Sequence, residues 1–564
     1  MKRFNLWWRA LSLLGLTFCI GESGDFHLPG FIGKSAFANT WAKTYGGADR
    51  ELALSVQQTF DTGYIVAGCA NSFGAGDYDF LVIKLDPSGD VEWSKTFGGT
   101  DVDYAYCVQQ TFDTGYIMIG HTKSFGTSNY DILVIKSDSS GNIEWSKTYG
   151  GGSAEFGFCI QQTPDTGYIV GGYTSSFGAG GGDFLAMKLS SSGAIDWAKT
   201  YGGSTGGEYA SSVQQTSDAG YIVAGVTSSF SAGSTDFLVI KLDSGSDVEW
   251  AKTFGGTGSE DLSFIQQTYD NGYIIAGSSN SYGVDNYDFL VIKIDSSGSL
   301  EWTKTFGGSG ADDAYSIQQT PDSGYIVAGF SQPFALAGGN FAIIKLNPSG
   351  SLDWSKVFGE TTSEEAHSIQ RTFDGGYIAA GYIEPSSPLV EDFLVIKIDS
   401  AAQMDPTCPW VNAPQSITSP TPITSSPTVI EAFCAPTTIP IGVTVNLPPL
   451  ITSTICGGAG IEERTKNPDL SRQNAKLFQN YPNPFTLRTT ISYVLPRDAN
   501  VHLAVYDISG RKVLTLVSQK MNAGGHSIEW EGKNPEGNRV TNGVYFLKLK
   551  TDSVAITQRM TVLR

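Results

Sequence analysis

The sequence predicts an all-β protein: a seven-bladed β-propeller with four-stranded blades, then a Pro-rich tether and a small Ig-like β-sandwich. A Trp-containing strand, such as VEWSKTFGG at 91–99, recurs seven times at intervals of 52 or 53 residues. That interval is typical of propellers and solenoids. Each interval holds four strand-like runs, separated by turns rich in Gly, Asp and Ser and without helical periodicity.

Residues 1–38 resemble an export signal and leader. Lys2 and Arg3 precede an apolar run at 11–21 that is too short to span a bilayer. Both Ser23 and Ala38 end acceptable cleavage sites. No other stretch is long and apolar enough to span a membrane, so we expect a protein that leaves the cytoplasm without a membrane span.

Residues 39–400 contain the repeats. Each repeat has SVQQT as the expected inner strand, then GYIVAG, then DFLVIK, and the Trp strand as the outer one. The run FLVIKL is apolar on both faces, which requires a sheet covered on both sides. The chain starts on a lone Trp strand at 40–46 and ends its repeats after DFLVIK at 392–397. We therefore expect three-plus-one closure, in which the lone strand completes the last blade.

Two residue types recur in every blade and are expected to be structural. Asp61 and its equivalents lie in a T-x-D-x-G hairpin, where the Asp bonds its own turn and the Gly adopts a positive φ. The Lys of DFLVIK is expected to pack its stem and leave its head in solvent.

A carboxylate stands six residues before the first Gln of every QQT motif, at the start of the inner strand. The seven are predicted to form a ring around one mouth of the central channel, either as acceptors of backbone hydrogen bonds or as a calcium site of oxygen ligands. No D-x-D-x-D-G loop supports calcium, so we expect no metal and no cofactor. The ring consists of Glu51, Asp103, Glu155, Glu208, Glu260, Asp312 and Glu364.

The longer loops are expected on the same face as this ring, and they differ between copies. Six carry an aromatic residue at one position, which would serve either as a plug between blades or as part of a sugar-binding surface. These aromatics are Phe73, Phe125, Phe177, Phe230, Tyr282 and Phe334.

Composition excludes several classes of function. The repeats hold 43 acidic and 17 basic residues, and this negative field makes nucleic acid a poor partner. With two His and two Arg, the repeats offer neither a His metal cluster nor the Arg clamp of a sialidase. We therefore expect no catalytic residues, although scattered carboxylate pairs could serve glycoside chemistry.

Residues 401–476 are rich in Pro, Ser and Thr and are expected to form a linker or a small β module. A strand pair could form within 440–454. Cys408, Cys434 and Cys456 lie here, and the sequence leaves their disulfide state open.

Residues 477–564 alternate like the strands of a small sandwich. The motifs NYPNPF, VYDISGRKV, NGVYFLKL and QRMTVLR resemble the C-terminal sorting domain of type IX secretion substrates. The resemblance implies export across the bacterial outer membrane by the type IX secretion machinery, and the repeats resemble secreted bacterial β-propeller proteins in general. The residues that carry the sorting motifs are Asn480, Tyr481, Pro482, Asn483, Pro484, Phe485, Asp507, Gly510, Arg511, Gly543 and Arg559.

Together these features predict a secreted or cell-surface protein with a non-catalytic binding or adhesion role, with a glycan or another surface component as ligand. The alternatives are a secreted polysaccharide-active enzyme, either a glycoside hydrolase or a lyase, and a purely structural surface protein.

Overall fold

The computed structural model describes residues 40–402, apart from 128, 284–285, 333–338, 360–362 and 385–390. It also describes the backbone of six short strands between 416 and 457, and residues 475–562 with short gaps. The expected leader, Phe334, Cys408 and Cys434 lie outside these residues. Across the described ranges the chain forms strands and turns, and no helix in them could cross a membrane.

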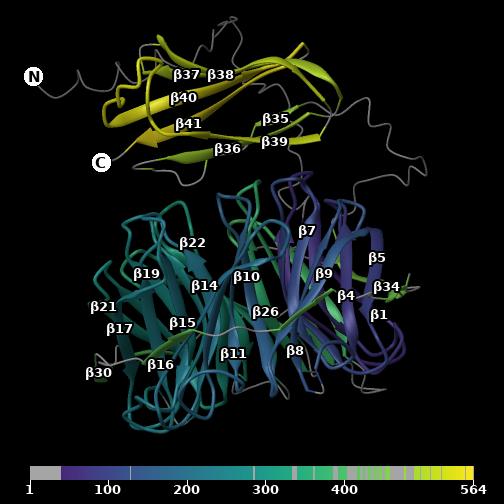
Figure 1. The fold of residues 1–564 in the computed structure, drawn as a ribbon, viewed down its shortest axis with the longest axis vertical. Helices are drawn as coiled ribbons and strands as arrows, with labels where there is room; N and C mark the ends of the chain where they lie inside the picture. Colours follow the sequence, from purple (N-terminus) through teal and green to yellow (C-terminus); the bar gives the residue numbers. More distant parts are fainter. Residues whose placement is uncertain are drawn as a thin grey trace, which may run out of the picture.

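Seven antiparallel sheets, here called sheets 1 to 7, each follow the order inner strand, second, third, outer strand (Figure 1). Sheet 1 consists of β2 (Glu51–Gln58), β3 (Tyr64–Ala70), β4 (Asp79–Leu85) and β5 (Val91–Gly98). Sheet 2 consists of β6 (Asp103–Gln110), β7 (Tyr116–Thr122), β8 (Asp131–Ser137) and β9 (Ile143–Gly150). Sheet 3 consists of β10 (Glu155–Gln162), β11 (Tyr168–Thr174), β12 (Asp183–Leu189) and β13 (Ile195–Gly202). Sheet 4 consists of β14 (Glu208–Gln215), β15 (Tyr221–Thr227), β16 (Asp236–Leu242) and β17 (Val248–Gly255). Sheet 5 consists of β18 (Glu260–Gln267), β19 (Tyr273–Ser279), β20 (Asp288–Ile294) and β21 (Leu300–Gly307). Sheet 6 consists of β22 (Asp312–Gln319), β23 (Tyr325–Ser331), β24 (Asn340–Leu346) and β25 (Leu352–Phe358).

Sheet 7 joins the two ends of the repeats. It holds β26 (Ser363–Arg371), β27 (Tyr377–Glu384), β28 (Asp392–Ile398) and β1 (Trp41–Gly46). β1 runs antiparallel to β28, with Trp41 opposite Lys397. The count of motif copies places this strand in the same position.

A separate apolar cluster fills the space between each sheet and the next. The clusters draw on both neighbours because the second and third strands are apolar on both faces. One of them joins sheet 7 to sheet 1, through Tyr45 and Phe393 on one side and Val66 and Leu81 on the other. The innermost strands also contact one another in turn, and β26 contacts β2.

The repeated Trp contacts the following sheet. Trp41 packs edge-on against Tyr64, with ring centroids 5.8 Å apart, and its indole N–H donates to the carbonyl of Pro87. The other six Trp residues meet the equivalent Tyr of the next sheet in the same geometry. Each sheet therefore needs its own Trp strand, because the Trp of that outer strand packs against the Tyr of the next sheet.

The QQ pair links neighbouring inner strands. The side-chain oxygen of Gln57 accepts from the backbone N–H of Gln110, and that of Gln110 accepts from the N–H of Phe60. Equivalent bonds recur around the repeats, including one from Phe373 N–H to Gln58. These amides thus satisfy backbone donors that strand pairing leaves open. The exceptions are Gln215, which has Pro164 opposite its amide oxygen, and sheet 7, where Arg371 replaces the second Gln.

The T-x-D-x-G hairpin differs from expectation in two respects. The positive φ belongs to the residue before the Gly, for example Thr62 at 74°. Gly63 is needed because a Cβ there would lie 2.2 Å from the carbonyl oxygen of Leu85 and 2.5 Å from the Lys84 nitrogen. A separate prediction, that the Lys of DFLVIK leaves its ammonium group in solvent, was wrong.

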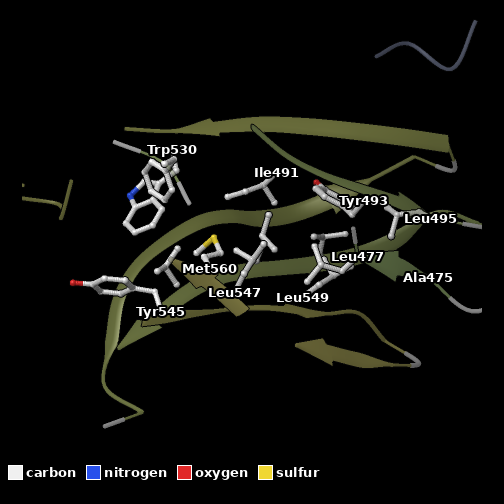
Figure 2. Packing of buried hydrophobic residues seen from close by; sticks show 14 of the residues in the cluster. Ala475, Leu477, Ile491, Tyr493, Leu495, Trp530, Tyr545, Leu547, Leu549 and Met560 are labelled. Carbon is white, nitrogen blue, oxygen red and sulfur yellow. The ribbon is translucent and has the colours of Figure 1, made fainter. Parts of the chain in front are cut away.

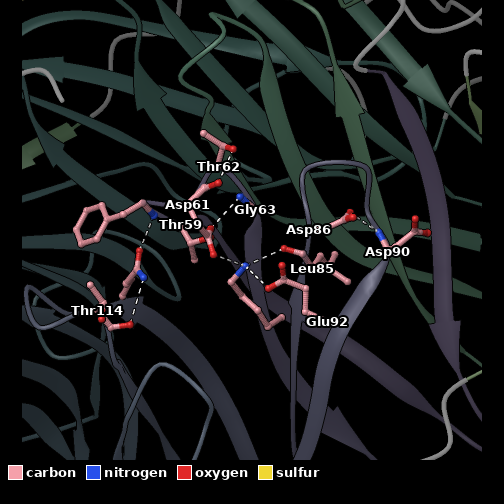
Figure 3. A network of polar contacts seen from close by, with 12 residues as sticks. Thr59, Asp61, Thr62, Gly63, Leu85, Asp86, Asp90, Glu92 and Thr114 are labelled. Atoms are coloured by element: carbon pink, nitrogen blue, oxygen red, sulfur yellow. Dashed lines mark hydrogen bonds and ion pairs between the residues drawn. The ribbon is translucent and has the colours of Figure 1, made fainter. Parts of the chain in front are cut away.

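Lys84 is buried, and its ammonium group has three acceptors (Figure 3). It lies 3.0 Å from the carboxylates of Asp61 and Glu92 and donates to the carbonyl of Leu85. Burial alone would raise the pKa of Asp61, but Lys84, the Thr59 hydroxyl and the Gly63 N–H hold that pKa below its usual value. The partners compensate for the buried charge, which is why the head need not reach bulk water.

The strained turns allow a direct test. Thr, a β-branched residue, takes a positive φ of 69° at Thr166, whereas sheet 7 has Gly375 at the equivalent position. Thr166→Gly should relieve about 1–2 kcal/mol of strain and lose part of this to chain entropy. We expect a net gain of about 0.5–1 kcal/mol in the free energy of unfolding, measured by denaturant titration. Gly375→Thr should have the opposite sign, and equal signs for the two variants would contradict the account.

Six short strands between 416 and 457 each add a fifth strand to one of six sheets, and together they are called the outer belt. Each strand starts seven residues after the previous one, and each first residue pairs with the Gly of an outer strand, from Ser416 with Gly307 to Ile451 with Gly46. The strands are β29 (Ser416–Thr418), β30 (Ile423–Ser425), β31 (Ile430–Phe433), β32 (Thr437–Pro440), β33 (Thr444–Asn446) and β34 (Ile451–Gly457).

The belt visits the sheets in reverse order: 5, 4, 3, 2, 1 and then 7. The strands within 440–454 pair with β5 and β1 rather than with each other. Among the described residues, sheet 6 has no fifth strand. Pairing covers the exposed edges that outer strands would otherwise present to other chains.

The C-terminal domain has two sheets. One has the order β35 (Lys476–Leu477), β36 (Thr489–Leu495), β39 (Gly524–Trp530); the other has the order β38 (Lys512–Met521), β37 (Ala499–Asp507), β40 (Gly543–Lys550), β41 (Ala555–Val562). Leu477, Ile491, Trp530, Leu547 and Met560 fill the core between them (Figure 2). This apolar cluster contains no residue of the repeats.

Candidate functional site

The seven predicted ring carboxylates are all buried, with exposures of 0–1%. Each starts, or nearly starts, an inner strand. Backbone N–H groups of the connection between sheets donate to Glu51, Asp103, Glu155, Glu208, Glu260 and Asp312. Glu155, for instance, accepts from the N–H of Gly151 at 2.7 Å and from the hydroxyl of Thr174 at 2.9 Å. Glu51 likewise accepts from the N–H groups of Gly47 and Ser72. Burial of this degree leaves no ring of charges facing open solvent.

The loop aromatics that the structure describes are half-buried beside the ends of the outer strands. Phe73, Phe230 and Tyr282 pack against the apolar clusters between sheets. A Cβ added to Gly47 would lie 2.6 Å from the Phe73 ring, and the hydroxyl of Tyr282 donates to the carbonyl of Gly255. They contact the protein in a way that suits plugs between sheets.

Sequence reasoning missed a different surface, formed by the second and fourth positions of the inner strands. We call it the inner-strand face. These positions alternate with buried ones, and they differ from sheet to sheet more than the motif residues of the repeat do. In sheet order, the second positions are Leu52, Tyr104, Phe156, Tyr209, Asp261, Asp313 and Glu365, and the fourth positions are Leu54, Tyr106, Phe158, Ser211, Ser263, Tyr315 and His367.

One half of the inner-strand face is aromatic. Tyr106 meets Phe158 edge-on with centroids 5.0 Å apart, and Tyr209 stacks on Tyr173 at 4.6 Å. Tyr209 keeps 47% of its surface exposed. Behind them lies buried His121, stacked on Tyr104, and burial lowers its pKa to about 4. This histidine is therefore neutral at physiological pH and belongs to the aromatic wall.

The other half is acidic. Asp261, Asp313 and Glu365 occupy one position on three successive inner strands. Burial raises the pKa of Asp261 and of Asp313, and each is raised further by the next carboxylate along the row. Like charges crowded at one level favour a ligand that offers hydrogen-bond donors.

His367 closes the acidic half. Its Nε2 lies 3.3 Å from Glu365, and its ring is sandwiched between Tyr315 at 4.5 Å and Tyr382 at 5.6 Å. Burial would raise the pKa of Glu365, but His367 and the two tyrosine hydroxyls lower it. Two neighbouring carboxyls, Asp313 and Glu365, thus have pKa values shifted in opposite directions.

No metal site is evident. Within the described parts of the chain, no three His, Cys, Asp or Glu side chains come together in a group that could hold a metal ion.

The predicted sorting residues that the structure describes have places in the C-terminal domain. Buried Asn480 donates to Thr489 at 2.8 Å, and Phe485 packs edge-on against Trp530. Asp507 accepts from both the backbone and the side chain of Arg511, and Gly510 supplies the positive φ of that turn. Gly543 starts β40, and Arg559 lies on β41 opposite Phe546. Residues 481–484 lie outside the described residues.

One family model matches part of the C-terminal domain. Residues 486–554 match the model of the FlgD Ig-like domain, so the C-terminal domain is Ig-like. The matched residues lie outside the repeats, and the matching model is an Ig-like domain, not a sorting domain. No curated protein matches the sequence.

Two solved structures from Porphyromonas gingivalis show distant similarity. PorZ, described as an essential bacterial surface component of the type IX secretion system, aligns over 91% of this chain and 81% of its own, with 9% identity and a TM-score of 0.31. Dimeric latent PorU aligns over 58% of this chain and 31% of its own, with 11% identity and a TM-score of 0.16. At these TM-scores the likeness supports no statement about fold or function.

Proposed function

We propose that this chain is a secreted, cell-surface binding protein, built on a closed seven-bladed β-propeller and delivered by its C-terminal domain. Closure is supported by the β1–β28 pairing and by the apolar cluster between sheets 7 and 1. Delivery is supported by the sorting motifs in residues 477–564 and by a core that the repeats do not share.

The ligand we propose is a neutral or amino-sugar glycan bound on the inner-strand face without catalysis. One observation carries this proposal: the seven sheets repeat closely, yet they diverge at these positions into an aromatic half and an acidic half. Aromatic faces stack on the C–H faces of sugars, and carboxylates accept hydrogen bonds from sugar hydroxyls. The acidic half would repel sulfated glycans and those with uronic acids.

The opposed pKa shifts of Asp313 and Glu365 favour a second candidate, a glycoside hydrolase with Asp313 as acid and Glu365 as base or nucleophile. Turnover of a polysaccharide by the full chain, lost in both Asp313→Asn and Glu365→Gln, would support this alternative. Binding without turnover would support the first.

The binding test uses a glycan array followed by calorimetry on the best neutral glycan. Tyr209→Ala and Asp313→Asn should each weaken binding about tenfold, which corresponds to about 1.4 kcal/mol. Tyr269→Ala is the matched control, because Tyr269 is 44% exposed, close to the 47% of Tyr209, but lies in a hairpin turn. Equal affinity in all three variants, or a preference for anionic glycans, would refute binding on this face.

A further inference from the structure

A second carboxyl group lies opposite six of the seven ring carboxylates, across the junction between sheets. It is the Asp that begins the third strand of the preceding sheet, and the Gly that ends the outer strand lies against both. A Cβ on Gly98 would lie 1.5 Å from Asp79 Oδ1 and 2.8 Å from Asp103 Oδ2. The distance between the two carboxyl oxygens therefore cannot exceed the sum of these two distances. The six pairs, here called seam pairs, are Asp392–Glu51, Asp79–Asp103, Asp131–Glu155, Asp183–Glu208, Asp236–Glu260 and Asp288–Asp312.

The carboxyl groups of the seam pairs are buried, apart from half-buried Asp392, and hydrogen-bond donors lie beside them. Asp79 and Asp103 are 1% and 0% exposed. The outer oxygen of Asp79 accepts from the N–H of Ala75 at 2.8 Å, and Asp103 accepts from the Gly99 N–H and the Ser124 hydroxyl. Oδ1 of Asp79, which points toward Asp103, has no hydrogen-bond partner among the described residues, and the same is true of Asp183 and Asp236.

The seventh junction shows what the position accepts. Asn340 replaces the Asp there and faces Glu364; a Cβ on Gly359 would lie 2.5 Å from the amide oxygen and 2.2 Å from the carboxylate. A carboxamide is neutral and can donate, as a protonated carboxyl can, so it is the closest natural mimic of protonated Asp.

We propose that each seam pair binds one proton, held between its two carboxyl groups, so that the sheets take up protons as they pack together. A metal cation fits the position less well, because each pair supplies only two carboxyl groups and the surrounding groups are donors. A buried carboxyl facing a carboxylate is stabilised when it donates, because two adjacent buried charges repel.

The electrostatics agree with the geometry. Burial, opposed by backbone donors and reinforced by the partner carboxylate, raises the pKa of Asp79, Asp183 and Asp236 to about 6. The loops beside the Asp79–Asp103 pair carry Asp77 and Asp101, which are exposed, and exposed Lys123 follows β7. Other seam pairs also have charged neighbours. Asp261 lies beside Glu260, and Asp313 lies beside Asp312. The Arg50–Glu391 ion pair lies beside Glu51 and Asp392.

The sign of the pH dependence follows. A carboxyl whose pKa rises from 3.8 to about 6 on folding stabilises the fold fully below about pH 4, and this stabilisation is lost as the pH rises to about 6. The hairpin carboxylates such as Asp61 have lowered pKa values and act oppositely, losing their contribution in acid. The two sets together place maximal stability in mildly acidic solution.

The test compares the full chain with Asp79→Asn, which copies the seventh junction, and with Asn340→Asp, which adds a seventh pair. Melting temperature is measured from pH 4 to 8, and proton uptake on refolding near pH 5. Asp79→Asn should take up about one proton fewer and depend less on pH; Asn340→Asp should take up about one more and depend more on pH. Infrared spectra of the unmodified protein should show protonated carboxyl bands at pH 5 that weaken by pH 8.

Two outcomes would overturn the proposal. One is either an unchanged pH dependence in both folded variants or the absence of a protonated carboxyl band at pH 5. The other is a rise in melting temperature caused by calcium chloride, but not by sodium chloride at matched ionic strength, and smaller in Asp79→Asn than in the unmodified protein, because this would assign the seam to a cation. The infrared measurement needs no variant, so it decides even if a variant fails to fold.

Discussion

Deleting residues 40–46 is expected to cost this protein most of its folding stability. The deletion removes β1, leaves the edge of β28 unpaired, and takes Trp41 and Tyr45 out of the cluster between sheets 7 and 1. Truncating one buried aromatic costs about 3–5 kcal/mol, while whole domains are stable by about 5–15 kcal/mol. We expect the melting temperature to fall by about 10 °C or more, with aggregation through the open edge visible by light scattering.

A graft provides the control for that deletion. Restoring Thr40 and replacing residues 41–46 by the equivalent outer-strand segment 250–255 keeps the Trp, the Lys and the strand length, and loses only the hydroxyl of Tyr45 that donates to Gly89. The graft should restore most of the melting temperature. A deleted chain that melts like the intact one and stays monomeric would refute closure by β1.

Removal of residues 477–564 is expected to abolish surface delivery and leave the repeats folded. The repeats and the C-terminal domain have separate apolar clusters, so the melting temperature of the remaining protein should stay within about 2 °C of the intact one. Cell fractionation should find it in the periplasm. Fusing 475–564 to an unrelated exported reporter tests sufficiency, since the reporter should then reach the surface. Normal delivery of the truncated protein would show that the sorting motifs do not direct export.

Periodicity made the sheets predictable. The interval of about 52 residues and the four motifs within it place every strand of the repeats, because one packing solution recurs in each sheet. Counting copies also gives the position of β1. These inferences depend on backbone geometry that identical local sequences share.

What the sequence did not disclose depends on contacts between repeats. The Asp of DFLVIK and the carboxylate before QQT belong to different sheets, so their meeting over Gly98 is a tertiary fact. The burial of Lys84, in contrast, depends on contacts within one sheet, with Asp61 of the hairpin turn and Glu92 of β5. The inner-strand face was hidden because its positions are the variable ones in a repeat that is otherwise recognised by sameness. A comparison of the seven copies at Tyr209 and Asp261 could have found it.

The outer belt was missed for another reason. Its strands pair through their backbones, and backbone pairing leaves little trace in side-chain identity. The one signal available was that the strands start every seven residues from Ser416 to Ile451. The Pro-rich composition of this region makes that interval hard to recognise in the sequence.

The order of the belt determines how the molecule would respond to a pull on its C-terminus. Force applied there loads β34 first, then β33, and so on to β29, because the belt runs back past the sheets one at a time. Each detachment would release seven residues, about 24 Å of extended chain, and leave the four-stranded sheet beneath it in place. A surface-held molecule built this way would lengthen in small steps under load, and its sheets would experience the full tension only after the last belt strand had come away.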